Sequence, residues 1–342
     1  GSTALRISRP TPIAGRLVLE NTTVSGDTVN FVGNGLELVN VTLNGQLVNR
    51  GHLKILDIAG IAYDFVLPAN SRLENLGTLE QTGDLRANAS SAQLINRGRW
   101  ILLGNNPDFY TSSGVTPTFR NEGYLAYQGS GTATWYYLNF TNRDSLEVRS
   151  GTWRFDYGTL TLQDGAYTVA SGALLQLNPG TLTLQGLLAA TLDGRLLFNA
   201  GVVRTLADTS AAPAGPILNF QGNGLEWQGG VFEGDTTLTN QGLLRITGQV
   251  RLRTHLVNTG TLAVEATFYG RSPALLENRA GARIEFRGDY HLYRDGGSSY
   301  GRMTLQNDGL LTKTAGTGTS TIDACVGGSG QIQGNFNIQC NL

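Results

Sequence analysis

Residues 73–79 read Leu73-Glu74-Asn75-Leu76-Gly77-Thr78-Leu79. The same phrase, apolar-x-Asn-x-Gly-x-apolar, recurs along most of the 342-residue chain at intervals of about 21 residues. A repeat of this length predicts a solenoid, in which each unit packs only on its neighbours. We interpret the asparagines of the phrase as structural corners: Asn49, Asn75, Asn96, Asn121, Asn142, Asn199, Asn240, Asn258, Asn278 and Asn307.

The phrase is typical of a bend between two buried strands. We expect Asn and Gly to take left-handed or turn conformations, and the apolar residues to end one strand and begin the next. Asparagines at equivalent corners of coils about 4.8 Å apart can also hydrogen-bond to one another as a ladder. A unit of about 21 residues leaves room for three short strands and three bends. We therefore predict an all-β, right-handed parallel β-helix of about 13–15 coils with terminal caps.

Composition supports this fold class. The chain has 46 glycines and only 15% charged residues, and it shows no long apolar pattern of helical period. Leucine-rich repeats are the rival solenoid, but their Leu-x-x-Leu-x-Leu consensus is missing. We expect residues 1–12 to be a cloning remnant and an N-terminal cap or leader, residues 13–324 the β-helix, and residues 325–342 a C-terminal coil or cap.

Charge and hydropathy argue against two classes of partner. The formal net charge is −1 and the basic residues are scattered, so nucleic acid is not an expected partner. No apolar run approaches the roughly 18–20 residues that cross a bilayer, so we expect no direct membrane insertion. The chain begins Gly1-Ser2 without Met, and we expect flanking domains of a larger parent protein.

The two cysteines, Cys325 and Cys340, both lie near the C-terminus. They suit a disulfide that closes a loop of about 15 residues in an oxidising compartment. Two reduced, buried thiols are the alternative. The three histidines lie far from the cysteines in sequence, so we expect no metal site and no cofactor.

The repeated phrase resembles the repeats of bacterial secreted β-helix exoproteins, of the filamentous-haemagglutinin and autotransporter-passenger kind. The tail Gly327-Gly328-Ser329-Gly330-Gln331-Ile332 is similar to a further unit of that sort. The resemblance implies a secreted or cell-surface adhesin that presents binding surfaces away from the cell.

Many parallel β-helices are polysaccharide lyases or hydrolases, and such enzymes need clustered carboxylates or calcium-binding aspartates. Here the acidic residues are spread one or two per unit, and the usual Asn-Thr-Asp, Asp-Asp and Gly-His-Gly phrases are missing. We expect no catalytic residue. A carbohydrate-active enzyme stays open as an alternative, because stacking of coils can gather residues from successive units.

Two features are candidates for binding. Aromatic residues concentrate between residues 119 and 157, where exposed rings can contact sugars. The alternative is that these rings alternate inward as core. The triplet Arg287-Gly288-Asp289 can imitate an integrin ligand, although its glycine equally suits a strand corner. The candidate ligand-binding residues are Tyr124, Tyr127, Trp135, Tyr137, Trp153 and Tyr157.

We therefore expect an extracellular adhesin that recognises glycans or a partner cell surface through the lateral faces of its coils. A ligand-free stalk or scaffold segment is the first alternative, and the polysaccharide-cleaving enzyme is the second.

Overall fold

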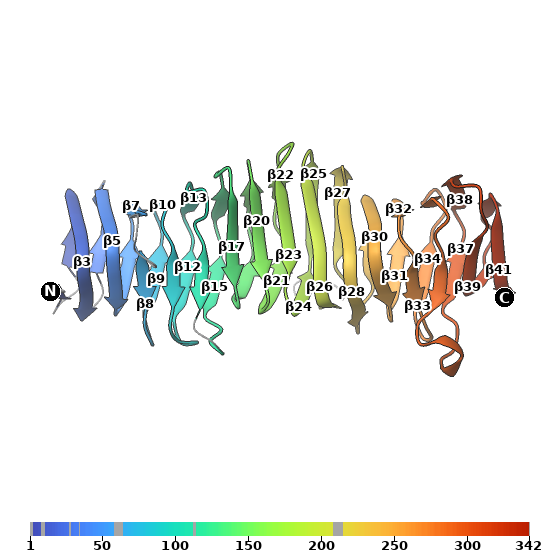
Figure 1. The fold of residues 1–342 in the computed structure, drawn as a ribbon, viewed down its shortest axis with the longest axis horizontal. Coiled ribbons are helices and arrows are strands. Elements are labelled where there is room, and N and C mark those ends of the chain that lie inside the picture. The colour runs from blue at the N-terminus through green and yellow to red at the C-terminus, as the bar shows by residue number, and fades with distance from the viewer. Residues whose placement is uncertain are drawn as a thin grey trace. The chain divides into compact units, whose positions relative to one another are not determined.

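A computed structural model describes residues 3–7, 11–26, 29–33, 35–57, 64–111, 114–207 and 215–341 of the chain. These residues form 41 strands and one 3-10 helix, η1 (Gly297–Ser299). Successive coils pair in parallel and make a β-solenoid of about 14 turns, which confirms the all-β solenoid predicted from the repeat. Figure 1 shows the strands lying side by side in each part of the chain.

The chain divides into two units. Unit 1 holds Gly1–Thr161 and Thr168–Pro179, and unit 2 holds Leu162–Tyr167 and Gly180–Leu342. The strands β21 (Thr159–Gln163) and β22 (Tyr167–Val169) contain residues of both.

Unit 1 has three faces, each a column of strands paired in parallel with the coil before and the coil after. The first face contains β2 (Thr11–Ile13), β4 (Val29–Phe31), β6 (Gln46–Asn49), β9 (Arg72–Asn75), β12 (Gln93–Asn96), β15 (Thr118–Asn121) and β18 (Asn139–Asn142). The second contains the first halves of β3 (Arg16–Gly26) and β5 (Gly35–Asn44), then β7 (His52–Ile55), β10 (Thr78–Gln81), β13 (Arg99–Leu102), β16 (Tyr124–Tyr127) and β19 (Leu146–Val148). The third contains β1 (Thr3–Ile7), the second halves of β3 and β5, β8 (Phe65–Leu67), β11 (Leu85–Ala87), β14 (Phe109–Thr111), β17 (Thr132–Tyr136), β20 (Thr152–Asp156) and β23 (Leu174–Asn178).

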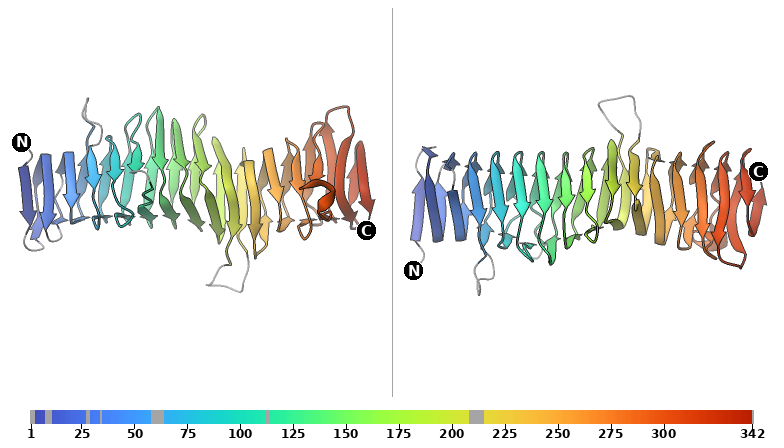
Figure 2. Two further views of the ribbon diagram at one scale, coloured as in Figure 1. Left: turned by 60° about the horizontal axis from the view of Figure 1, so that its bottom comes forward. Right: turned by 90° about the horizontal axis from the view of Figure 1, so that it is seen from above.

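The strand pairings give unit 2 the same three-faced plan, and both views of Figure 2 show its strands lying side by side. One face contains β25 (Leu187–Leu192), β27 (Ile217–Gly222), β29 (Leu238–Asn240), β31 (His255–Asn258), β34 (Leu275–Asn278), β37 (Thr304–Asn307) and the second halves of β39 (Ser320–Gly327) and β41 (Phe336–Asn341). Another contains the first halves of β26 (Arg195–Thr205), β28 (Leu225–Gly234) and β30 (Leu243–Leu252), then β32 (Thr261–Val264), β35 (Arg283–Arg287), β38 (Leu310–Ala315) and β40 (Gln331–Gln333). The last contains β24 (Thr181–Gln185), the second halves of β26, β28 and β30, β33 (Phe268–Gly270), β36 (Leu292–Arg294) and the first halves of β39 and β41.

Alternating side chains of each strand fill the interior, as the period of two residues in a strand requires. In unit 1 the interior between β14 and β20 is aromatic. Trp135 lies 5.0 Å from Trp153 and 5.4 Å from Phe155 between ring centroids, in edge-to-face arrangements. These rings bury large apolar surfaces and favour this relative orientation.

The corner asparagines form two ladders of buried side chains, one in each unit. In unit 1 the Nδ2 atom of each donates to Oδ1 of the next, through Asn49, Asn75, Asn96, Asn121 and Asn142, at 2.7–2.8 Å. In unit 2 the same bonds join Asn240, Asn258, Asn278 and Asn307 at 2.7–2.8 Å. Eight of the nine amides also donate to a backbone carbonyl of the next coil, as Asn96 does to the Tyr124 oxygen at 2.9 Å, and Asn142 donates to the Asp144 carbonyl of its own coil.

Asn199 lies at a bend between the two halves of β26, which belong to different faces, but it is not a member of either ladder, so its predicted place at the same corner as the other asparagines is wrong. It lies in the middle of β26, its side chain is exposed, and the buried position beside it is taken by Ala200. The pairing of β26 with β28 changes register on both sides of Asn199, which turns the side chain of this phrase outward.

The reason for glycine in the phrase also differs from the prediction. Among the described residues, Gly77 and Gly98 are not in the left-handed region, and neither are the corner asparagines. Glycine is required because the coils approach closely at the corner. A Cβ atom on Gly98 would lie 2.2 Å from the carbonyl oxygen of Gly77, one coil earlier.

The predicted disulfide between Cys325 and Cys340 is confirmed, and the two residues are register partners on β39 and β41. Of residues 1–12, the described ones include β1, which pairs in parallel with β3, and most of β2, which pairs with β4.

Candidate functional site

Two exposed tyrosines of unit 1 have an unusual backbone. Tyr137 and Tyr157 follow β17 and β20 directly and have φ values of 54° and 64°. This left-handed region is costly for a bulky side chain and is usually occupied by Gly or Asn. The two rings stack with centroids 4.7 Å apart and planes 12° from parallel, yet the residues stay 45% and 54% exposed.

A second tyrosine pair lies beside the first on the outer side of the third face. Tyr110 of β14 and Tyr136 of β17 stack with centroids 5.6 Å apart. The Tyr110 hydroxyl donates to Oδ2 of Asp108 at 2.8 Å. Burial raises the pKa of Tyr110 above its usual value, and burial also raises the pKa of Asp108. The Tyr110 hydroxyl therefore stays protonated at neutral pH.

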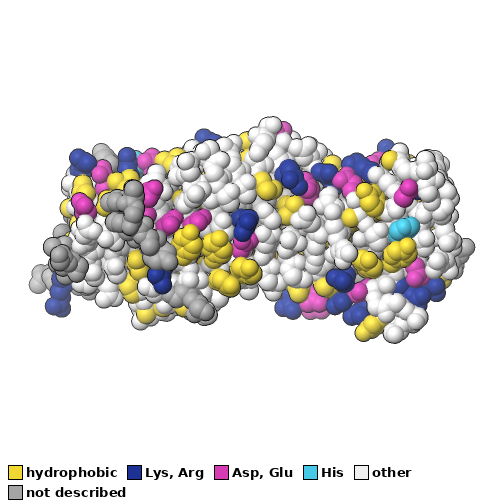
Figure 3. Space-filling model, in the orientation of Figure 1, with side chains coloured by type: hydrophobic (Ala, Val, Ile, Leu, Met, Phe, Trp, Pro, Cys, Tyr) yellow, Lys and Arg dark blue, Asp and Glu magenta, His cyan; other side chains and the backbone are white. Residues whose placement is uncertain are grey.

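A charged pair completes this surface, which we call the tyrosine face: Tyr110, Tyr136, Tyr137, Tyr157, Arg154 and Asp156. Arg154 donates from Nε to Oδ2 of the buried Asp156 at 3.0 Å, and this hydrogen bond raises the pKa of Arg154. Asn178 donates from Nδ2 to Oδ1 of the same carboxylate at 2.8 Å. In Figure 3, hydrophobic side chains lie next to a basic and an acidic side chain over this part of unit 1.

The register brings these groups together from three coils. Phe109 and Trp135 are register partners, and Tyr110 and Tyr136 are the residues that follow them in sequence. Tyr136 is in turn the register partner of Asp156 on the next coil. An aromatic surface with a fixed guanidinium, a carboxylate and an amide offers ring contacts and directional hydrogen bonds together. A sugar has an apolar ring face and polar hydroxyl groups, so it can use both kinds of contact.

Only two of the six predicted ligand-binding aromatics lie on the tyrosine face, Tyr137 and Tyr157. The prediction is wrong for Tyr127, Trp135 and Trp153, which are at most 1% exposed and belong to the core. The alternation of the strands turns these three rings inward. Tyr124 lies on β16 of the second face, where the guanidinium of Arg99 covers its ring at 4.2 Å.

Sequence reasoning did not select Tyr110, Tyr136, Arg154 or Asp156. The signal was the spacing within the strands: Trp153 and Phe155 point inward, so Arg154 and Asp156 point outward as a pair. A consistent inward and outward assignment over β14, β17 and β20 would have found them.

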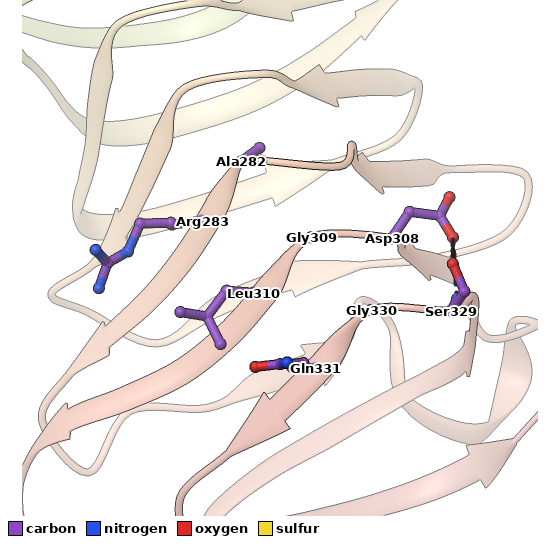
Figure 4. A pocket seen from close by; sticks show the side chains of 9 residues that line it. Ala282, Arg283, Asp308, Gly309, Leu310, Ser329, Gly330 and Gln331 are labelled. Atoms are coloured by element: carbon purple, nitrogen blue, oxygen red, sulfur yellow. Dashed lines mark hydrogen bonds between the residues drawn. The ribbon is translucent and has the colours of Figure 1, made fainter.

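Unit 2 has an open groove of about 470 Å³ along the second asparagine ladder (Figure 4). Its floor is the corner backbone at Gly309 and Gly330, where a Cβ atom would lie within 2.5 Å of the preceding coil. Oδ1 of Asp308 in this groove accepts hydrogen bonds from the Ser329 amide and hydroxyl groups at 3.0 and 3.1 Å. The lack of side chains at these glycines explains the groove, and the Asp308 carboxylate in it is already hydrogen-bonded to Ser329.

The triplet Arg287-Gly288-Asp289 begins at the end of β35. Arg287 pairs with Glu265 and Glu285 at 3.0 Å each, and Asp289 pairs with Lys313 at 2.5 Å. Both charged side chains of the triplet are thus engaged within unit 2.

Within the described part of the chain, no three His, Cys, Asp or Glu side chains gather as metal ligands. A search of the same residues for a helix with the length and hydropathy to cross a bilayer finds none.

No protein family model matches this chain, and searches of curated proteins and of solved structures find no match either. The geometry of the described residues is therefore the basis for the functional interpretation.

Proposed function

We propose that this protein is an extracellular binding protein of the β-solenoid adhesin kind, and that it holds a glycan on the tyrosine face of unit 1. The observation that carries the proposal is the left-handed backbone of the exposed Tyr137 and Tyr157. Strained backbone costs on the order of 1–3 kcal/mol per residue and is concentrated at functional sites.

Stability of the fold gives no reason for tyrosine at these two positions. The side chains do not fill the core, and Asn or Gly would adopt the same backbone more easily. Tyrosine is instead suited to contact with an external ligand, because it presents a rigid ring with a polar end. Arg154, whose side chain is 38% exposed, would then contribute hydrogen bonds to sugar hydroxyl groups, and the buried Asp156 would hold it in place.

An extracellular location is supported by the disulfide between Cys325 and Cys340, because disulfides persist mainly in oxidising compartments. The resemblance of the repeats to secreted bacterial exoproteins agrees with this location, and a parallel β-solenoid is the fold that the resemblance implies.

The test is a glycan array followed by calorimetry with the variants Tyr137→Asn and Tyr157→Asn. Because Asn relieves the backbone strain, we expect both variants to unfold at or above the wild-type temperature and to lose glycan binding at least tenfold. Tyr124→Phe, on the second face, is the matched control and should bind like the wild type.

Two results would overturn the proposal. One is glycan binding that both asparagine variants retain. The other is a protein that binds no glycan and whose melting temperature falls by several degrees in both variants, since this would make the stacked rings structural supports of a ligand-free stalk.

A further inference from the structure

Unit 2 carries a second surface, on different elements from those of the tyrosine face. Arg251 of β30, Tyr269 of β33 and Tyr293 of β36 are register partners on three successive coils. The Arg251 guanidinium lies 5.8 Å from the Tyr269 ring centroid, and the Tyr269 and Tyr293 rings are 6.4 Å apart. His291 stacks on Tyr293 at 4.9 Å. This row therefore presents one positive charge next to two tyrosine rings.

Arginines outnumber their carboxylate partners on this surface. Arg251, Arg253 and Arg271 all face the one buried carboxylate of Asp295, with their Nε atoms 3.4, 3.0 and 3.9 Å from its oxygens. Because one carboxylate neutralises only one charge, two positive charges remain in this cluster.

A second shared carboxylate extends the positive region. Arg294 and Arg302 both pair with Asp323, at 3.4 and 2.6 Å. The five guanidinium groups and two carboxylates of both clusters leave a local charge of +3. In the preceding coil, Glu233 pairs with Arg204 at 3.1 Å.

The loop after β36 places a third ring at the edge of the surface. This loop contains η1 (Gly297–Ser299) and is the orange-red loop with a short helix in the left view of Figure 2. Arg271 lies 4.1 Å from the ring centroid of Tyr300, which stays 47% exposed. The Tyr300 carbonyl accepts from Arg294 at 3.3 Å, and the Gly301 carbonyl accepts from the Ser272 amide at 3.0 Å. Basic side chains gather around this loop in Figure 3.

We propose that this arginine–tyrosine surface, made of Arg251, Arg253, Arg271, Tyr269, Tyr293 and Tyr300, binds an anionic polysaccharide through its carboxylate or sulfate groups. Guanidinium groups recognise such groups by paired, charge-assisted hydrogen bonds. The neighbouring rings provide the apolar surface on which a sugar ring can lie. Successive coils lie ~4.8 Å apart, so side chains on neighbouring coils can contact charged groups on successive sugars of one polysaccharide.

A polysaccharide fits this surface better than a nucleic acid does. Nucleic acid binding draws its affinity from neutralising many phosphates. Here the excess is only three charges, and the formal net charge of the whole chain is −1. The proposal goes beyond the function assigned to the tyrosine face, because it concerns another unit and another class of ligand.

The experiment compares four probes by calorimetry: dextran sulfate, polygalacturonate, uncharged dextran and a poly(dT) strand. We expect saturable binding to dextran sulfate or to polygalacturonate, weakened by added salt, and none to dextran. The better of the two anionic probes identifies whether sulfate or carboxylate is the natural group.

Two variants test the residues. Arg251→Gln leaves Arg253 and Arg271 to neutralise Asp295, and Tyr293→Ala removes an exposed ring, so neither change disturbs the core. We expect each to weaken binding about tenfold, or about 1.4 kcal/mol. Arg283→Gln removes an arginine of β35, on another face of unit 2, that pairs with Glu285 at 3.0 Å, and it serves as the matched control. Tyr137→Asn should leave this binding unchanged, which separates the two proposed sites.

The proposal is overturned if neither anionic polysaccharide binds, if Arg251→Gln binds like the wild type, or if poly(dT) binds as tightly as the polysaccharides at the same salt concentration.

Discussion

Replacing Asn96 by Ala removes the centre of the ladder in unit 1. Asn96 is completely buried, accepts from Asn75 at 2.8 Å, and donates to Asn121 Oδ1 at 2.7 Å and to the Tyr124 carbonyl at 2.9 Å. The substitution takes a donor away from the buried Asn121 Oδ1 atom and from the partly buried Tyr124 carbonyl, whereas the Asn75 amide keeps its bonds to the Gly77 and Arg99 carbonyls. A buried group that loses its partner costs about 1–3 kcal/mol, so we expect a loss of about 4 kcal/mol.

Hydrogen exchange followed by mass spectrometry measures this loss locally, which suits a solenoid whose stability is a sum over neighbouring coils. A loss of about 4 kcal/mol accelerates exchange about a thousandfold in the peptides of β9, β12 and β15. Asn199→Ala is the control, because Asn199 belongs to the same phrase but is exposed and outside the ladder. We expect a change under about 0.5 kcal/mol there. Equal exchange in the two variants would refute the ladder argument.

Two further changes test the packing of the coils. Burial, together with the nearby charges of Asp108 and Asp64, raises the pKa of Asp84 to about 7. A raised pKa in the folded state means that stability is fully present below the ordinary pKa of about 4 and is lost as the pH rises through 7. Asp84→Asn keeps an oxygen that accepts from the Asp108 amide, but carries no charge. The melting temperature of this variant should exceed that of the wild type by a few degrees at pH 8 and match it at pH 4. Equal melting temperatures at pH 8 would contradict the raised pKa of Asp84. Gly98→Ala places a Cβ atom 2.2 Å from the Gly77 oxygen, whereas Gly35→Ala meets only the flexible Arg16 side chain at 3.2 Å. Thermal unfolding should show a far larger loss for Gly98→Ala, and similar losses would mean that the coils relax at the corner.

The repeat predicted the fold because each coil of a solenoid packs only on its neighbours. Asn96 and Asn121 are far apart in sequence, but both lie at the end of a strand on the same face, and a fixed period is enough to place one above the other. The period did not reveal that the phrase at Asn199 falls within a long strand, because the change of register there depends on contacts between β26 and β28.

The candidate site was only partly predictable. An aromatic concentration marks a region but not a direction, and one residue of shift moves a ring from the core to the surface. Trp135 and Tyr136 illustrate this, since they are neighbours on β17 and the first is 1% exposed in the core, whereas the second lies on the tyrosine face. The left-handed backbone of Tyr137 has no signature in the sequence, because tyrosine is an unexpected residue for that conformation.

The stacking of coils in register is tested most directly by spin-label distances along one face of unit 1. Gln46, Gln93, Thr118 and Asn139 begin strands of the first face, and each is joined to the next through register partners. With one nitroxide fixed at position 46, moving the other to 93, 118 and 139 should give backbone separations that grow by ~4.8 Å per coil, to about 10, 14 and 19 Å. Separations that do not grow in equal steps along this series would contradict the parallel solenoid.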